Sequence, residues 1–144
     1  MSTMYLLDTN VVSELRKPKP HGAVVEWMRA QQSNALYVSA MTIAEIQQGI
    51  ELTRAQDVAR ADALERWLLQ DLLPNAQVLA IDADVARCWA KMMHKRSNTL
   101  YEDAFIAATA QTHRLTVVTR NVRDFKALGV DSLDPFASTG KHKK

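Results

Sequence analysis

Four acidic residues occupy comparable places along the chain, each following an apolar segment or lying early in a helical one. They are Asp8, Glu45, Asp103 and Asp124. Clustered carboxylates repel one another and raise one another's pKa values unless cations lie between them. All-oxygen ligand sets suit Mg²⁺ or Mn²⁺ rather than zinc or copper. If the fold gathers these residues, they predict a metal site that activates water for phosphoryl displacement.

Each acidic residue also has an ordinary structural explanation. Asp8 is a suitable N-cap for the helical segment that follows it. The segment 42–45 matches a capping box, in which the glutamate would bond the backbone of the threonine. The segment 121–124 fits a helix cap with an acidic third position, and Asp103 would favour the dipole of its own helix. Because each explanation is plausible alone, the coincidence of all four is the stronger evidence for a site.

Strands and helices are expected to alternate along the chain. Apolar runs predict strands at 4–7, 36–38, 78–81 and 115–119, with a last extended piece at 132–133. Helical patterns are expected at 9–15, 24–28, 39–50, 57–72, 82–93 and 101–113, with a turn or short helix at 120–125. This alternation predicts a parallel sheet covered on both faces. Ligands bind beyond the carboxyl ends of such strands, where the four acidic residues would meet.

The composition is that of one globular domain. The chain has 144 residues, 47% hydrophobic and 24% charged, and a net charge of +2. Lys141, Lys143 and Lys144 outweigh that net charge, so the remainder is near neutral and does not by itself predict nucleic-acid binding. We expect a single domain over 1–137 and a disordered basic tail over 138–144. The single cysteine, Cys88, excludes an internal disulfide and a zinc thiolate cluster.

No apolar run is long enough to cross a bilayer, and the N-terminus lacks the pattern of a secretory signal. A cytoplasmic location without membrane partners is therefore the expectation. The two helices between the second and third strands make a longer connection than two parallel strands require. They are expected to form an arm used for self-association.

Four motifs together resemble PIN-domain proteins, and among them the VapC/FitB type of toxin ribonuclease. They read LLDTNVVSEL at 6–15, SAMTIAEIQQG at 39–49, EDAFIAATA at 102–110 and VTRNVRDF at 118–125. The resemblance extends from about residue 4 to 136. One departure is Asp134-Pro135-Phe136, where Asn-Pro-Trp would be expected. That difference affects packing at the last strand and leaves the chemistry intact.

The resemblance implies an α/β fold, a three-layer α/β/α sandwich with a central, mainly parallel sheet of four to five strands. It implies a Mg²⁺- or Mn²⁺-dependent endoribonuclease, the toxin of a type II toxin–antitoxin system. It further implies a homodimer and a small DNA-binding antitoxin whose C-terminal segment blocks the active site. The acidic set that it implies for catalysis and metal binding is Asp8, Glu45, Asp103 and Asp124.

We hypothesise that Asp8 and Asp103 are the most direct metal ligands, with Glu45 and Asp124 completing the site directly or through water. Three polar residues are assigned to support these ligands or to contact phosphate: Asn10, Thr119 and Asn121. Thr9 is assigned a purely structural role.

Two other functions compete with this interpretation. A phosphatase of another α/β class would use Asp8 as a nucleophile, but such sites place a second aspartate two residues on, where this chain has Asn10. A PIN-like scaffold that binds RNA or protein without cutting is the second alternative. It would have no need of four mutually repelling carboxylates.

Overall fold

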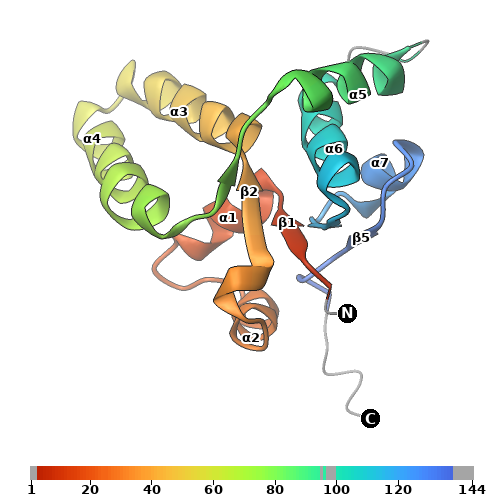
Figure 1. The fold of residues 1–144 in the computed structure, drawn as a ribbon. Helices are drawn as coiled ribbons and strands as arrows, with labels where there is room; N and C mark the ends of the chain where they lie inside the picture. The colour runs from red at the N-terminus through yellow and green to blue at the C-terminus, as the bar shows by residue number, and fades with distance from the viewer. Residues whose placement is uncertain (1–2, 95, 97–99, 138–144) are drawn as a thin grey trace.

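The centre of the molecule is a parallel five-stranded sheet (Figure 1). The computed structural model describes residues 3–94, 96 and 100–137, so the predicted tail at 138–144 lies outside the described residues. The strands are β1 (Tyr5–Leu7), β2 (Leu36–Ser39), β3 (Val78–Leu79), β4 (Thr116–Val118) and β5 (Ser132–Leu133). Their order is β3-β2-β1-β4-β5, and every pairing is parallel. The predicted α/β fold is confirmed.

Alternation of side chains along the strands separates two cores. Leu6 of β1 lies opposite Val117 of β4, and both are fully buried in one cluster with the helical residues of the C-terminal half. Leu7 and Val118, one position further along, face the other cluster. Successive strand residues point to opposite faces of a sheet, so each strand serves both cores. Three layers result, as the resemblance implied.

Seven α-helices surround the sheet or extend from it in the described residues (Figure 1). They are α1 (Thr9–Leu15), α2 (Gly22–Arg29), α3 (Ala40–Arg54), α4 (Val58–Arg66), α5 (Ala83–Met93), α6 (Tyr101–His113) and α7 (Val122–Ala127). Short helical turns occupy η1 (Ser33–Ala35), η2 (Trp67–Leu72) and η3 (Leu73–Asn75). Helices α1 and α2 lie on one face, and α5, α6 and α7 lie on the other. None of the described helices combines the length and apolarity needed to cross a membrane.

The predicted single α-helix over 57–72 is α-helical only over α4. The chain continues as the π-helix η2, whose wider turns end just before Pro74. A proline cannot join an α-helical ladder, so a change of winding at this point is expected. Within η2 one face still packs inward, because Leu68 is buried while Leu69 is exposed.

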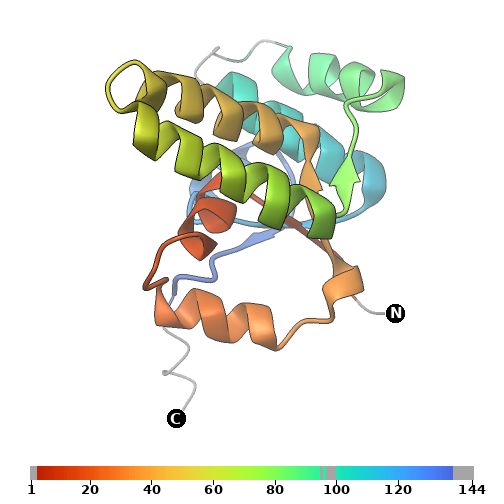
Figure 2. The same cartoon turned by 90° about the vertical axis from the view of Figure 1, so that its left-hand side faces the viewer.

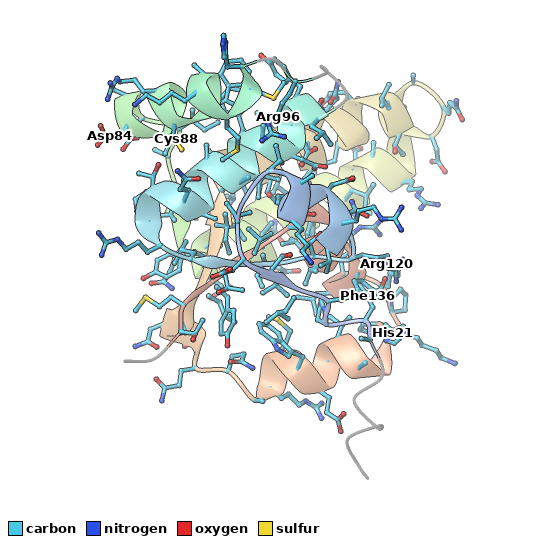
Figure 3. All side chains as sticks on the ribbon, turned by 90° about the vertical axis from the view of Figure 1, so that its right-hand side faces the viewer. His21, Asp84, Cys88, Arg96, Arg120 and Phe136 are labelled. Carbon is cyan, nitrogen blue, oxygen red and sulfur yellow. The ribbon has the colours of Figure 1, made fainter. Side chains whose placement is uncertain are left out.

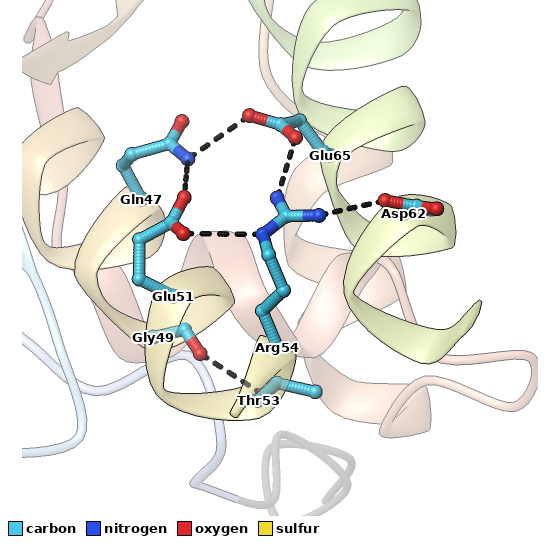
Figure 4. A network of polar contacts seen from close by, with 7 residues as sticks. All are labelled: Gln47, Gly49, Glu51, Thr53, Arg54, Asp62 and Glu65. Atoms are coloured by element: carbon cyan, nitrogen blue, oxygen red, sulfur yellow. Dashed lines mark hydrogen bonds and ion pairs between the residues drawn. The ribbon is translucent and has the colours of Figure 1, made fainter. Parts of the chain in front are cut away.

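Helices α3 and α4 form an arm that extends to one side of the sheet (Figure 1), and the two helices lie side by side (Figure 2). Its two helices are joined by the guanidinium of Arg54, which bonds Asp62 at 2.7 Å and Glu65 at 2.6 Å across the pair (Figure 4). The same guanidinium bonds Glu51 at 3.1 Å, and the amide of Gln47 bridges Glu51 and Glu65. A single surface ion pair stabilises little, but one arginine shared by three carboxylates fixes the geometry of the pair. The arm therefore gives α3, which carries Glu45, a defined support.

Candidate active site

Asp8 lies at the point where β1 ends and α1 begins. Its backbone N–H donates to the carbonyl of Val118 at 2.9 Å, and its side chain is only 3% exposed. One carboxylate oxygen accepts from the N–H of Thr9 at 2.8 Å, so Asp8 is indeed the N-cap of α1. The other oxygen accepts from the hydroxyl of Thr119 at 2.7 Å and from the amide of Asn10 at 3.2 Å. Capping and site formation are thus combined in one residue.

Burial raises the pKa of Asp8 above its ordinary value, against the opposing effect of the hydrogen bonds from Thr119 and Thr9. A carboxylate removed from water favours its protonated form unless a positive charge is supplied.

The loop after β4 is tied to the same carboxylate. The hydroxyl of Thr119, which donates to Asp8, also accepts from the backbone N–H of Asn121 at 2.8 Å. The side-chain oxygen of Asn10 accepts from the backbone N–H of Arg120 at 3.2 Å. The side chains of Asn10 and Thr119 therefore bond Asp8, in line with their predicted supporting role. Asn121 contributes through its backbone N–H instead. Its side chain makes no capping bond to α7.

Glu45 lies further into α3 than the capping-box pattern suggested, because the helix begins directly after Ser39. Ser39 is the N-cap, accepting from the N–H of Met41 at 3.0 Å. Thr42 therefore lies inside the helix, and the predicted bond between Glu45 and its backbone is wrong. Instead, Glu45 accepts a hydrogen bond from the hydroxyl of Thr9. Burial raises the pKa of Glu45, and the charges of Asp8 and Glu102 raise it further, against the lowering effect of the Thr9 hydrogen bond.

The contact with Glu45 gives the structural role assigned to Thr9 a specific form. Its hydroxyl oxygen lies 3.1 Å from that of Thr42 and links α1 to α3. The sequence places these residues more than thirty positions apart, and only the adjacency of β1 and β2 brings them together. The one feature of the sequence that placed Thr9 near the site was that it directly follows Asp8.

Asp103 is the carboxylate whose pKa is raised by the charges of all the other acidic residues of the cluster. It lies in the first turn of α6, partly buried, and Asp124 lies in the first turn of α7. Burial, the largest cause, and the charges of Asp8, Asp124, Glu45 and Glu102 together raise the pKa of Asp103 to about 6. All four predicted residues therefore lie within electrostatic reach of one point beyond the carboxyl edge of the sheet.

The oxygen atoms of the four carboxylates are suitable ligands for a hard divalent cation such as Mg²⁺. Burial raises the pKa values of Asp8, Glu45 and Asp103, with neighbouring carboxylate charge adding to the rise for Glu45 and Asp103. Over residues 3–94, 96 and 100–137, no three acidic, histidine or cysteine side chains are already gathered into a metal cage. A bound cation would relieve the repulsion between the carboxylates.

Thr119→Val tests the support of Asp8. Removing the buried hydroxyl while keeping the side-chain shape is expected to lower, by about 10-fold or more, the RNA cleavage that the four motifs imply, which is the size of effect for a group that would orient a metal ligand. Unfolding free energy should fall by about 1–2 kcal/mol because a buried hydrogen bond is lost. Thr109→Val is the matched control, since Thr109 is equally buried but donates to the carbonyl of Phe105 within α6 at 2.8 Å. Equal activity losses in both variants would contradict a specific role for Thr119.

A model of the PIN domain matches residues 5–130. The chain therefore belongs to the PIN-domain family. It is 38% identical over 139 residues to "VapC ribonuclease Y4jK" of Sinorhizobium fredii, covering 92% of this chain and 98% of that protein. It is 35% identical over 139 residues to "Toxin FitB" of Neisseria gonorrhoeae, covering 92% of this chain and 99% of that protein.

The solved structures agree with these relatives. The crystal structure of FitAcB from Neisseria gonorrhoeae matches with a TM-score of 0.81 and 34% identity, covering 94% of this chain and all of that chain. The resemblance drawn from the four motifs is confirmed at the level of sequence and of fold.

Proposed function

We propose that this protein is a metal-dependent endoribonuclease that acts as the toxin of a type II toxin–antitoxin system. The observation that carries the proposal is the convergence of four carboxylates on Asp103, in a PIN-domain chain whose relatives are named as a ribonuclease and a toxin. RNA phosphodiester bonds are the substrate, and 5′-phosphate and 3′-hydroxyl ends are the expected products.

Asp8 and Asp103 would hold the metal most directly, and Glu45 and Asp124 would complete the site. When bound, Mg²⁺ or Mn²⁺ supplies positive charge and an activated water for attack on phosphorus. The chain's own part is positioning. Thr119 holds one oxygen of Asp8 while the N–H of Thr9 holds the other, so the carboxylate keeps one orientation.

The proposal includes the partners expected of such a toxin. A small DNA-binding antitoxin would bind this chain and block the site, and two copies of the chain would form a homodimer in the cytoplasm. Residues 1–137 would make up the single domain. Light scattering of the purified protein, alone and with the product of the neighbouring reading frame, measures both assemblies.

Cleavage of end-labelled structured RNA tests the function. The protein is incubated with the RNA in Mg²⁺, Mn²⁺ or EDTA, beside an Asp103→Ala variant. Metal-dependent cuts that disappear in the variant are the expected result. Cuts that persist in EDTA and in the variant would come from a contaminant, and the absence of any cut across a broad RNA pool would favour a non-cleaving scaffold. Release of phosphate from small phosphoesters without RNA cleavage would favour the phosphatase alternative.

A further inference from the structure

The acidic cluster repels the substrate it is proposed to cut, because RNA is a polyanion. A cation near the cluster would offset this repulsion without entering the metal site. Arg120 is in that position. It directly follows Thr119, whose hydroxyl donates to Asp8, and its own backbone N–H donates to Asn10.

The side chain of Arg120 rests on an aromatic ring. Its guanidinium carbon lies 3.7 Å from the centre of the Phe136 ring, a cation–π contact. Arg120 follows β4 and Phe136 follows β5, and these two strands are parallel neighbours. Both residues therefore lie beyond the carboxyl edge of the sheet, the same edge that carries Asp8.

Further contacts hold the ring of Phe136 in place beneath Arg120 (Figure 3). The ring of His21 meets Phe136 edge-on, with ring centres 5.5 Å apart and planes at 70°. The backbone N–H of His21 donates to Glu14 at 2.8 Å, and that buried carboxylate also bonds the amine of Lys17 at 2.9 Å. The link between α1 and α2 is thereby fixed against the last described segment of the chain.

The nitrogens of the guanidinium form no salt bridge to a carboxylate within residues 3–94, 96 and 100–137. Arg120 is also exposed. The acidic group whose charge does reach it, Glu14, is already bonded to Lys17 and His21. Stacking orients the flat guanidinium but uses only its face, so its edge remains able to bind an anion through paired N–H donors.

We propose that Arg120, held on the ring of Phe136, binds a backbone phosphate of the RNA beside the bond that is cut. The inference rests on the proposed ribonuclease function. It assigns Arg120 to substrate binding and Phe136 to positioning the guanidinium of Arg120. The aromatic residue of the Asp134-Pro135-Phe136 segment would then affect RNA binding as well as packing.

Four variants separate this role from a structural one. Arg120→Gln removes the charge, Arg120→Lys keeps the charge but loses the flat paired donors, and Phe136→Leu removes the ring beneath the guanidinium. Arg29→Gln is the control: Arg29 is exposed in the last turn of α2, from which the chain enters β2 at its amino end, opposite the site. Cleavage of the labelled RNA is measured for each across a salt series, and thermal melts confirm folding.

Arg120→Gln is expected to raise KM about tenfold with little change in kcat, the factor for one lost charge-assisted contact. The slope of log affinity against log salt should become shallower by about 0.7, the value for one phosphate contact to a single strand. Arg120→Lys and Phe136→Leu should give smaller rises in KM, with only Arg120→Lys keeping the wild-type salt slope. Arg29→Gln should match the wild type in both quantities.

An Arg120→Gln protein with the KM and salt slope of Arg29→Gln would overturn the proposal. So would a loss confined to kcat, or a loss that parallels a lower melting temperature. The same RNA is also bound in EDTA, where no cleavage occurs. If the wild type cuts no RNA but its binding weakens only in the Arg120 and Phe136 variants, the nuclease function fails while the phosphate contact stands.

Discussion

Asp8→Asn is expected to abolish RNA cleavage while leaving the fold intact. Asparagine is as good an N-cap as aspartate, so the bond to the N–H of Thr9 is retained and α1 still begins at the same residue. The negative charge that would attract the metal is gone, however. We expect the single-turnover cleavage rate in saturating Mg²⁺ to fall at least about 100-fold, the upper limit for residues that only orient metal ligands.

The retained fold is measured by circular dichroism and thermal melting in EDTA. Because burial raises the pKa of Asp8, loss of its charge stabilises the metal-free fold, and this gain offsets the loss of the bonds that Thr119 and Asn10 donate to the second oxygen, so the variant should remain folded without metal. Metal-dependent cleavage by Asp8→Asn at the wild-type rate would remove Asp8 from the site. Loss of activity accompanied by unfolding would make it a structural cap only.

Asp103→Asn is expected to stabilise the metal-free protein near pH 7.5. The pKa of Asp103 is raised from 3.8 to about 6, so the folded state binds this proton more tightly than the unfolded state does. The ionised carboxylate therefore destabilises the fold above about pH 6, and that penalty disappears as the pH falls below about 4. The full shift corresponds to about 3 kcal/mol, which solvent screening of this partly exposed group reduces to about 1–2 kcal/mol.

Melting in EDTA measures the effect. The variant should melt about 3–6 °C above the wild type at pH 7.5, and the difference should vanish near pH 4. Adding Mg²⁺ should raise the melting temperature of the wild type and not that of the variant. Glu102→Gln is the control, because Glu102 is the exposed neighbour and contributes least to the pKa of Asp103. A variant less stable than the wild type at pH 7.5 would show that the four charges do not face one another.

The sheet was predictable because its strands are short apolar runs that alternate with helices. The start of α3 was also predictable, because the helix expected over 39–50 has Ser39 as its observed N-cap, and only the alternative capping pattern at 42–45 was misleading. One part of the site was not predictable from local patterns. The contact between Thr9 and Glu45 depends on β1 and β2 being neighbours, which strand patterns alone do not specify.

The same limit applies to the contact between Arg120 and Phe136. Each residue follows a strand, but only the order of those strands in the sheet places the arginine over the ring. The acidic set was easier to recognise, because charged residues at strand ends and helix starts are conspicuous in the sequence.

The strand order also determines when, during synthesis, this protein can first act. β1 lies between β2, which follows soon after it in the sequence, and β4, which begins only at residue 116. Thr119 and Asp124 leave the ribosome later still. A nascent chain therefore carries Asp8 without the neighbours that would complete the site until residue 124 has been made. Any product that terminates before the β4–α7 segment should be unable to cut RNA.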